Sequence, residues 1–400
     1  MKWEKVKLSD CCSSIADGDH QPPPKAESGV PFVTIANINQ FNQFDFSNTM
    51  FVPQDYYDQL DAKRKAKAGD VLYSVVGSFG IPVLAKDFTP FVFQRHIAIL
   101  RPNEKLVSAF LYYTMLSKDF YAKADAAALG AAQRTISLNA LRNIEVFLPP
   151  IDTQKKIVDI LSAYDSLIEN NQKQIKLLEE AAQRLYKEWF IDLRFPGWED
   201  TPIVDGVPEG WAKTTVERAA AILRRGISPS YDENGDSMVI NQKCIRQTVV
   251  DLGEARKQTK KYPGEMNLQD GDTVICSTGD GTLGRVGQVF GEYENTTLDS
   301  HVTLVRATSD VGAQMLFWTV KSQQAFLQGM GKGSTNQLEL NRSVIQELLF
   351  ILPDAKTRIA FEGLAQAIHN KITSHNKQII ALQTTRDNLL PKLMNGEIEA

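Results

Sequence analysis

Two glycine-rich segments are the places in this chain where phosphate-binding chemistry could be expected. Residues 279–284 read Gly-Asp-Gly-Thr-Leu-Gly, a spacing that holds a dinucleotide pyrophosphate when a helix follows it. Residues 285–290 are strand-like instead, so the segment predicts a hairpin loop. Residues 329–334 contain the Gly and Lys of a P-loop, but Gly333 stands where a hydroxyl must bind magnesium. Neither segment predicts a nucleotide-binding site.

The cysteines and histidines lack the spacing of a metal or nucleophilic site. There are four cysteines and five histidines. Cys11 and Cys12 are adjacent and no Cys-x-x-Cys pair occurs, so neither zinc nor a disulfide framework is expected. His20, His96 and His301 occur singly in polar segments, and there is no Asn-Pro-Pro-Tyr methyltransferase loop or paired acidic-lysine nuclease signature. The sequence therefore predicts a chain that catalyses nothing, holds no metal and keeps its thiols free.

The composition is that of an ordinary globular protein. The chain has 400 residues, of which 43% are hydrophobic and 23% charged, enough for two domains with complete cores. No apolar run approaches the roughly 18 residues of a membrane span, and the first residues lack a signal-peptide core, so a cytoplasmic protein without membrane contact is expected. The net charge of −4 argues mildly against a freestanding nucleic-acid binder. Basic clusters at 63–67, 224–225 and 257–261 soften that objection, and charge alone leaves the question open.

The chain repeats itself with a period near 200 residues. A Gly-Asp pair precedes a strand-like run at 69–74 and again at 271–277. Residues 147–149 correspond to 351–353, and residues 173–175 correspond to 377–379; both pairs are displaced by 204 residues. This period is too long for a solenoid, whose units have about 20–50 residues. The sequence therefore predicts a duplicated domain, each copy followed by a helix, doing one job at two places.

Each copy begins with a body of mixed α/β character, at residues 1–150 and 209–352. One amphipathic helix is expected late in each body, over 107–123 and 311–328. Residues 194–208 are rich in Pro and Gly and predict a linker. Strand-like runs, separated by Gly, Asp and Asn, are found at 31–35, 70–76, 97–100, 273–277 and 302–305.

Each copy ends in a helix with a seven-residue apolar repeat, expected over 151–193 and 353–400. Such a repeat keeps one stripe of the helix facing a partner helix. The five heptads from Gln154 to Trp189 alone would measure about 54 Å at 1.5 Å per residue, longer than one body, so packing of each helix on its own domain is the less favoured alternative. Antiparallel pairing would bring the polar residues Asn171 and His375 together and fix the register. The expected coiled-coil interface consists of Ile157, Leu161, Tyr164, Ile168, Asn171, Ile175, Leu178, Leu185, Phe361, Ile368, Ile372, His375, Ile379, Leu382, Leu389 and Leu393.

The plan of the chain resembles that of the specificity subunits of type I restriction-modification systems. The resemblance covers the whole chain and depends on order, period and junctions rather than on one motif. Besides the duplicated body and helix, the similar segments are Ala16-Asp-Gly-Asp-His20, Gly69-Asp-Val-Leu, the junction at 188–197, residues 206–211 and the ending at 389–398.

The resemblance implies an α+β fold class with two tandem mixed α/β target-recognition domains, separated and joined by two long helices that form an antiparallel coiled coil. Each domain would read one half of a split, asymmetric double-stranded DNA site, and the helices would act as a ruler. The implied partners are two methyltransferase (modification) subunits and the restriction/translocase subunits. These partners would use S-adenosylmethionine, ATP and magnesium, whereas this chain would carry no cofactor. Phosphate contacts made by partners would make the modest net charge acceptable.

Two other classes of protein remain open. A non-catalytic scaffold adaptor would bind proteins or glycans at a fixed separation, and it would not retain duplex DNA with or without a methyltransferase partner. An enzyme would bind S-adenosylmethionine or a nucleotide as an isolated chain.

If the chain reads DNA, polar and basic loop residues of the bodies are the candidates for contact. Asn and Gln suit adenine edges and Arg suits guanine, through paired hydrogen bonds, and a minority of the candidates are expected to touch bases. The candidates in the first body are Asp19, His20, Gln21, Asn37, Asn39, Ser78, Gln94, Arg95 and Arg134. Those in the second body are Arg224, Arg225, Asn241, Gln242, Lys243, Thr278, Asp280, Arg285, Ser300, His301 and Lys332.

Two aromatic residues at the end of the first helix, Trp189 and Phe190, have two alternative roles. They could help to dock the methyltransferase subunits, one beside each body. They could equally close the core where the helix meets the linker. The sequence does not choose between these roles.

Overall fold

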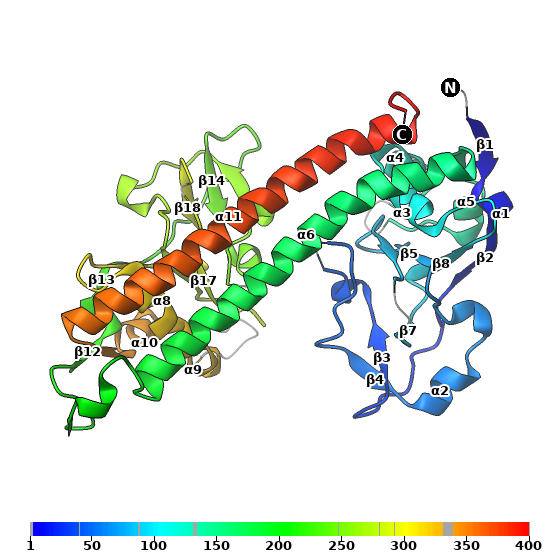
Figure 1. Cartoon of the computed structure of the whole chain (residues 1–400). Coiled ribbons are helices and arrows are strands. Elements are labelled where there is room, and N and C mark those ends of the chain that lie inside the picture. The colour runs from blue at the N-terminus through cyan, green and yellow to red at the C-terminus, as the bar shows by residue number, and fades with distance from the viewer. Residues whose placement is uncertain are drawn as a thin grey trace. The chain divides into compact units, whose positions relative to one another are not determined.

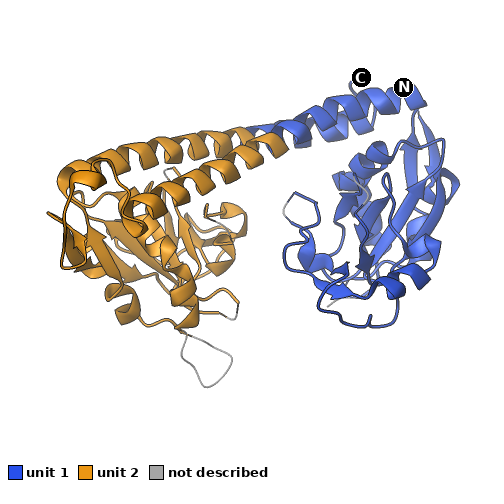
Figure 2. Ribbon diagram, turned by 60° about the horizontal axis from the view of Figure 1, so that its bottom comes forward, with its two compact units in different colours: residues 1–168, 380–400 blue, residues 169–379 orange. Residues whose placement is uncertain are grey.

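The computed structural model describes residues 3–39, 41–86, 89–130, 134–246, 248–279, 281–291, 293–330 and 339–399 (Figure 1). The chain forms two compact units, one of residues 1–168 with 380–400 and one of residues 169–379 (Figure 2). Two long helices, α6 (Ile151–Tyr186) and α11 (Ala355–Met394), contribute residues to both units. In the part of the chain that the structure describes, no helix is long and apolar enough to cross a membrane.

The first unit contains the first body, which is built from two main sheets. The antiparallel sheet has the strand order β2-β8-β5-β6, and a three-stranded sheet has the order β4-β3-β7, with β3 and β7 parallel. β1 pairs with β9 and so joins the start of the body to its end. The strands are β1 (Glu4–Lys7), β2 (Cys12–Asp17), β3 (Val30–Val33), β4 (Met50–Val52), β5 (Val71–Ser74), β6 (Pro82–Leu84), β7 (Val92–Phe93), β8 (Ile97–Pro102) and β9 (Glu145–Leu148). The helices are α1 (Leu8–Cys11), α2 (Gln54–Gln59), α3 (Ser108–Leu116), α4 (Lys118–Ala126) and α5 (Leu138–Arg142).

The second unit contains the second body, which repeats this topology. Its antiparallel sheet has the order β13-β19-β16-β17, its three-stranded sheet has the order β15-β14-β18, and β12 pairs with β20. The strands are β12 (Ala212–Thr215), β13 (Ala220–Arg225), β14 (Ser237–Ile240), β15 (Arg256–Gln258), β16 (Thr273–Cys276), β17 (Val286–Gln288), β18 (Thr296–Leu298), β19 (Val302–Ala307) and β20 (Leu349–Leu352). The helices are α7 (Val216–Ala219), α8 (Ala313–Ser322), α9 (Gln324–Gly329) and α10 (Arg342–Gln346). The duplication read from the sequence is therefore a duplication of fold.

The central strands are apolar on both faces because each face meets a different core. In β5, Val71 and Tyr73 pack with Phe110 of α3, whereas Leu72 between them packs with Phe93 of β7. Successive side chains of a strand point to opposite faces, so the four buried residues of β5 serve both cores. A continuous apolar run is what such a strand requires.

The repeated Gly-Asp pair marks a buried ion pair in each body. Arg101 donates from Nε and Nη2 to the two carboxylate oxygens of Asp70, at 2.8 Å each. Arg306 donates in the same way to Asp272, at 2.7 Å each. The preceding glycine, Gly69 in the first body, has a φ of 90°, a conformation that favours glycine. The motif therefore fixes the start of the central strand rather than a ligand.

The two long helices pack beside each other in both units. In the first unit, Ile157 near the start of α6 shares a core with Leu393 near the end of α11. In the second unit, Ala182 near the end of α6 shares a core with Phe361 near the start of α11. This arrangement is antiparallel, and every residue expected at the interface is buried or half-buried. The same cores contain residues of the bodies, so each helix packs on its partner and on a body at once.

The prediction of a single late helix in each body is wrong, because two shorter helices occupy that part of each body. Ser117 ends α3 and caps α4 by accepting a hydrogen bond from Phe120 N at 3.2 Å, as serine does at a helix start. The second break lies at Gln323, between α8 and α9. The expected linker contains a 3-10 turn at Trp198–Asp200 and a hairpin of β10 (Ile203–Val204) and β11 (Val207–Pro208). The strands on either side of the glycine-rich stretch, β16 and β17, are paired antiparallel, as the expected hairpin requires.

Trp189 and Phe190 lie inside a core, which favours the second of their two alternative roles. They belong to a π-helical segment, Lys187–Ile191, that extends α6, and they are 7% and 4% exposed. The Phe190 ring lies 4.9 Å from that of Phe361 and 5.7 Å from that of Trp211, between centroids. These aromatics close the core where the helix meets the second body.

Candidate nucleic-acid interface

Loops at one end of the first body converge, and most first-body candidates lie on them. The backbone N–H of Asp19 donates to Phe93 O at 3.0 Å, and that of Arg95 donates to Asp19 O at 3.1 Å. The N–H of Val75 donates to His96 O at 2.9 Å. These bonds hold the segments that follow β2 and β5 against the turn between β7 and β8. They bring together the candidates Asp19, His20, Gln21, Ser78, Gln94 and Arg95.

The Asp19 carboxylate already accepts hydrogen bonds within this cluster. Tyr56 donates its hydroxyl to the Asp19 carboxylate, and Arg64 Nη1 donates to Oδ1 at 3.2 Å. Burial opposes ionisation of Asp19, but the bond from Tyr56, the backbone N–H groups of Gln21 and His20, and the charge of Arg64 outweigh it and lower its pKa. The carboxylate therefore remains charged and holds the loop in shape.

Three other first-body candidates also serve the local fold. Asn37 Oδ1 accepts from the Thr34 N–H at 2.8 Å in a capping box around the 3-10 helix Ile35–Asn37. Asn39 Oδ1 accepts from the N–H of Phe41 at 2.9 Å. Arg134 pairs with Asp125 at 2.6 Å. In contrast, Gln21, Ser78 and Arg95 are exposed, and His20 is exposed with Nε2 at 2.9 Å from Asp17.

The second body gathers its candidates in the corresponding loops. Thr278 Oγ1 lies 2.6 Å from His301 Nδ1 and donates to Gln242 Oε1 at 3.5 Å. The N–H of Ser277 donates to His301 O at 2.8 Å, as Val75 does to His96 in the first body. The ends of β14 and β16 and the turn between β18 and β19 thus meet. This cluster holds the candidates Gln242, Lys243, Thr278, Ser300 and His301.

The remaining second-body candidates divide between structural and surface positions. Asn241 is 9% exposed; its Oδ1 accepts from the Lys243 N–H at 2.8 Å and caps the 3-10 helix Gln242–Cys244, while its Nδ2 donates to Glu254 O at 2.8 Å. Arg285 is half-buried in the β16–β17 hairpin; burial raises the pKa of the Cys276 thiol to about 12, and the Arg285 charge opposes that rise. Arg224 and Arg225 end β13 at the surface. Asp280 and Lys332 lie outside the described residues.

Sequence reasoning missed two residues beside this cluster. Asn341 and Arg342 line a surface concavity together with Arg224, Arg225 and Glu339. Glu339 forms a backbone bridge with Thr278, and Leu340 N donates to Ser277 O at 2.8 Å. The available signal was a basic residue at the start of a short helix, which is common on protein surfaces and does not by itself indicate a site.

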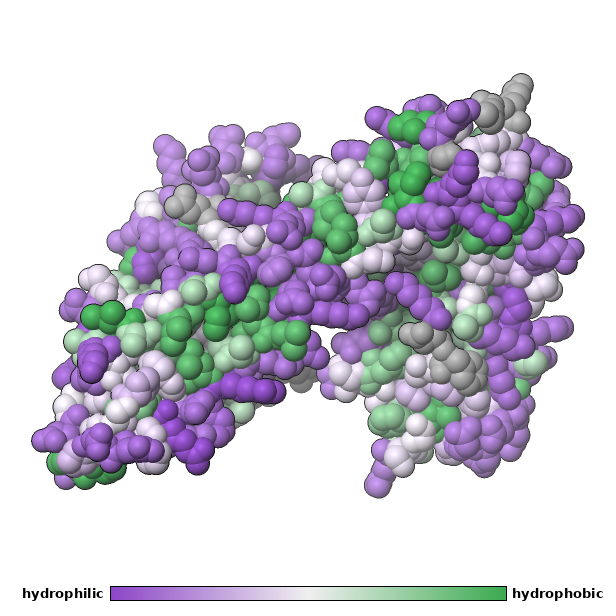
Figure 3. Space-filling view, in the orientation of Figure 1, coloured by the Kyte–Doolittle hydropathy of each residue, from purple (hydrophilic) through white to green (hydrophobic). Residues whose placement is uncertain are grey.

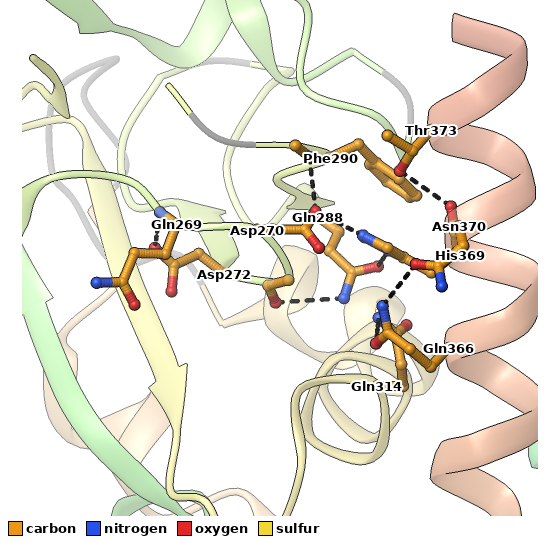
Figure 4. A network of polar contacts seen from close by, with 12 residues as sticks. Gln269, Asp270, Asp272, Gln288, Phe290, Gln314, Gln366, His369, Asn370 and Thr373 are labelled. Atoms are coloured by element: carbon orange, nitrogen blue, oxygen red, sulfur yellow. Dashed lines mark hydrogen bonds and ion pairs between the residues drawn. The ribbon is translucent and has the colours of Figure 1, made fainter. Parts of the chain in front are cut away.

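A polar network fixes the second body to α11 (Figure 4), and the sequence did not reveal it. His369 of α11 is 2% exposed, with Nε2 at 2.8 Å from Asp270 Oδ1 and Nδ1 at 3.2 Å from Gln288 Oε1. The Phe290 ring stacks on the imidazole with centroids 4.1 Å apart. Burial opposes ionisation of Asp270, but the bonds from His369 and Gly291 N outweigh it and lower its pKa. The network attaches the second body to α11, and we call it the mount of that body.

The first unit has a corresponding mount. Tyr113 donates its hydroxyl to Asp165 Oδ2 at 2.6 Å, and Arg386 Nη1 donates to Asp165 Oδ1 at 2.7 Å. Asp165 of α6 stands 204 residues before His369 of α11, so the two mounts occupy equivalent helix positions. Among the described residues, no group of three or more His, Cys, Asp or Glu side chains could hold a metal ion. The side chains gathered at the loops are hydrogen-bonding and cationic groups suited to base edges and phosphates.

Comparisons with known proteins give matches of one kind. Residues 1–180 match the family model described as the type I restriction modification DNA specificity domain. The chain is 24% identical to the type I restriction enzyme HindI specificity subunit of Haemophilus influenzae, over 99% of each protein. It is also 24% identical to the MjaIX specificity subunit of Methanocaldococcus jannaschii, over 99% of this chain and 93% of that protein. The chain is thus similar, over its whole length, to specificity subunits of type I restriction enzymes.

A solved structure has the same fold. It is the S subunit of a type I restriction-modification system from M. genitalium, with a TM-score of 0.55 and 15% identity, covering 98% of this chain and 96% of that one. Two α/β bodies and two long helices are therefore a fold that this chain shares with that S subunit, as the sequence predicted.

Proposed function

We propose that each body of this chain reads one half of a bipartite, asymmetric double-stranded DNA site for a type I restriction-modification complex. The observation that carries this proposal is one loop cluster built twice with different side chains. Asp19 and Gln94 bridge the cluster of the first body, and Ile227 and Asp299 bridge that of the second. Gln94 and Asp299 are therefore equivalent positions, and the residues that follow them, Arg95 and Ser300, are counterparts. Two similar frames with unequal surfaces suit two half-sites of unequal sequence.

The chemistry of the exposed loop residues supports base readout. The Arg95 side chain is exposed, while its backbone is held by the hydrogen bond to Asp19 O. A guanidinium on a fixed loop can make paired hydrogen bonds with the O6 and N7 of a guanine. In the second body, Gln242 and Lys243 offer an amide and an ammonium group beside His301. The structural candidates Asn37, Asn39, Asn241 and Arg134 act by shaping these loops.

Catalysis belongs to partner subunits in this proposal. Two methyltransferase subunits would methylate adenine with S-adenosylmethionine, and restriction/translocase subunits would use ATP and magnesium, all in the cytoplasm. The long helices are the proposed docking surface for the methyltransferase subunits. Figure 3 shows hydrophobic residues gathered over the long helices of the second unit, where Leu177, Ile359 and Leu364 are 58%, 70% and 50% exposed. This apolar surface supports docking on the helix faces rather than at Trp189 and Phe190.

Coexpression of the chain with its methyltransferase subunit, followed by methylome sequencing, tests the function. Adenine methylation at one bipartite motif, absent without this chain, is the expected result. Arg95→Ala should relax recognition in one half-site only, with a loss of about 1–3 kcal/mol of discrimination. Lys118→Ala, an exposed cation at the start of α4, is the control and should leave the motif unchanged. If the complex retained no duplex DNA, a scaffold adaptor would be the better description.

A further inference from the structure

A basic concavity of about 410 Å³ lies at the surface of the second body. Its lining is Arg224, Arg225, Glu339, Asn341 and Arg342. Three guanidinium groups against one carboxylate give this lining a formal charge of +2, on a chain whose net charge is −4. Such a local excess of positive charge attracts an anion.

The concavity adjoins the loop cluster of the second body. Glu339 bridges Thr278 through the backbone, and Thr278 Oγ1 lies 2.6 Å from His301 Nδ1. Arg225 donates from Nη2 to Leu340 O at 3.0 Å, which ties the end of β13 to the same segment. An anion held in the concavity would therefore lie beside the residues that we assign to base readout.

The three arginines differ in how firmly they are held. Arg225 Nη1 donates to Glu339 Oε1 at 2.5 Å, and Arg224 Nη1 donates to Glu265 Oε1 at 3.0 Å. The Arg224 and Glu265 side chains are 53% and 58% exposed, and ion pairs so exposed to water contribute little, so Arg224 can exchange its carboxylate for another anion at small cost. Arg342 is exposed, and no carboxylate of the described residues lies within ion-pair distance of it.

We propose that this concavity binds a backbone phosphate of the DNA duplex next to the half-site of the second body, with Arg342 and Arg224 as its main ligands. The proposal rests on the proposed function and adds a contact to it. Guanidinium groups bind phosphate through paired, charge-assisted hydrogen bonds. A phosphate contact carries no base information, but it fixes the register of the protein on the duplex. Arg224 and Arg225 thereby contribute to position and affinity, not to the choice of bases.

The described residues of the first body do not repeat this lining. β2 and β13 pair with β8 and β19 in the same register, so Asp17 is the counterpart of Arg225 and Ala16 that of Arg224. Thr135 bridges Val76 as Glu339 bridges Thr278, and Leu138 begins α5 as Arg342 begins α10. One acidic and three neutral residues thus stand in place of Arg224, Arg225, Glu339 and Arg342, four of the five lining residues. The second body supplies this phosphate contact without a counterpart in the first.

The salt dependence of DNA binding tests the site. The full chain, in complex with its methyltransferase subunit, is titrated with a duplex carrying its methylation motif between 0.05 and 1 M salt, on the order of the range in which counterion release is measured. One lost phosphate contact lowers the magnitude of the negative slope of log K against log salt by about 0.9. Arg342→Gln should therefore bind roughly eightfold more weakly at about 0.1 M salt and equally well near 1 M. The methylated motif should be the same as that of the parent chain.

Arg218→Gln is the matched control. Arg218 is exposed on α7, before the start of β13, whereas Arg224 and Arg225 lie at the end of that strand. The substitution makes the same change of net charge away from the concavity, and the slope should not change. Glu339→Gln removes the carboxylate that competes for Arg225 and should tighten binding at low salt.

Each other result overturns the assignment. Equal slopes for Arg342→Gln and Arg218→Gln would show that the concavity contacts no phosphate of the duplex, while the proposed function would stand if the parent complex still bound its motif. A changed methylation motif in Arg342→Gln would mean that this residue reads a base. Arg342-dependent binding of inorganic phosphate without any effect on duplex binding would assign the concavity to a small anion. If the parent complex bound no duplex, the proposed function itself would fail.

Discussion

The side chains of Asn171 on α6 and His375 on α11 meet within the second unit, with Asn171 Oδ1 at 2.6 Å from His375 Nδ1. The two residues stand 204 positions apart, which is the displacement of the sequence repeat, so each is the counterpart of the other. An antiparallel pair of equivalent helices brings a residue beside its own counterpart at one level only. This contact therefore marks the level about which the two helices are related.

Breaking this contact should destabilise the helical pair. Asn171 is 7% exposed, so Asn171→Ala leaves the His375 ring without a partner in a largely buried seam. The expected cost is about 1–3 kcal/mol in the free energy of unfolding, measured by urea denaturation. Asn171→Leu combined with His375→Leu should recover most of that loss, because two apolar residues can fill the seam, but it should weaken the choice of register. A cost for the single variant below about 0.5 kcal/mol would show that water replaces the contact without loss.

The sequence predicted the long helices and the duplicated bodies well, because their signals are local or periodic. A seven-residue repeat defines a stripe without knowledge of the partner, and the 204-residue displacement of Phe147-Leu-Pro149 and Ile351-Leu-Pro353 needs no structure to be seen. The mounts of the bodies could not be predicted. His369 lies beside the apolar stripe of α11, not on it, and only the fold brings Asp270, which lies 99 residues earlier, to its ring.

The candidate readers were separated only by the structure. Arg95 and Arg134 are both arginines in polar loops, but Arg134 is held by Asp125 and Arg95 is exposed. Asn37 and Asn241 looked suitable for adenine edges, yet both cap 3-10 helices. Asn and Asp favour such caps and turns for local reasons, so a loop asparagine in this fold is as readily a structural residue as a base-contacting one.

Each body has its own buried ion pair, Asp70–Arg101 in the first and Asp272–Arg306 in the second. We therefore expect that each body can be destabilised separately. Asp272 is 3% exposed; burial raises its pKa, and the bonds from Arg306 oppose that rise. Arg306→Met leaves a buried carboxylate without its cation, at an expected cost of about 3–5 kcal/mol. Hydrogen exchange should show faster opening of the second body, with the first body unchanged. Arg101→Met is the matched variant and should speed exchange in the first body while leaving the second body unchanged. Equal protection from exchange in both bodies, for either variant, would contradict the prediction.

The pH dependence of stability should contain a term from Glu179. Burial raises its pKa to about 7, although the Lys321 charge and a hydrogen bond with Thr248 oppose the rise. The folded-state pKa lies above that of an unfolded Glu, about 4.3, so the folded chain binds this proton more tightly. The resulting stabilisation is complete below about pH 4.3 and is lost as pH rises through about 7.

Urea denaturation between pH 5 and pH 8 measures this term, with those limits chosen to span roughly the window between the two pKa values. The free energy of unfolding should fall by up to about 3 kcal/mol over the window, and Glu179→Gln should flatten that fall. Glu188→Gln, an exposed glutamate at the end of the same helix, is the control and should keep the slope of the parent chain. A parent-like slope in Glu179→Gln would assign the pH dependence to other groups.

If the long helices set the gap between the two DNA half-sites, lengthening both should lengthen that gap. The inserts must lie at the same level of the antiparallel pair. Inserting at equivalent positions of the 204-residue repeat, such as 180 and 384, does not meet this requirement. Equivalent positions lie opposite each other only near Asn171 and His375, so inserts at 180 and 384 would shift the register between the helices. Inserts after Ile168 on α6 and after Ile379 on α11 fall between the Asn171–His375 and Asp165–Arg386 contacts, and they leave both contacts intact.

Four residues added at each of these points extend each helix by about 6 Å at 1.5 Å per residue. One base pair rises about 3.4 Å, so methylome sequencing should show a spacer longer by one or two base pairs with unchanged half-site sequences. Four residues are close to a full helical turn, so the apolar stripe stays near its place. Two residues rotate the stripe by more than half a turn, and that variant should lose stability instead of changing the spacer. A four-residue variant that folds and keeps the original spacer would show that the separation of the half-sites is set by something other than the length of these helices.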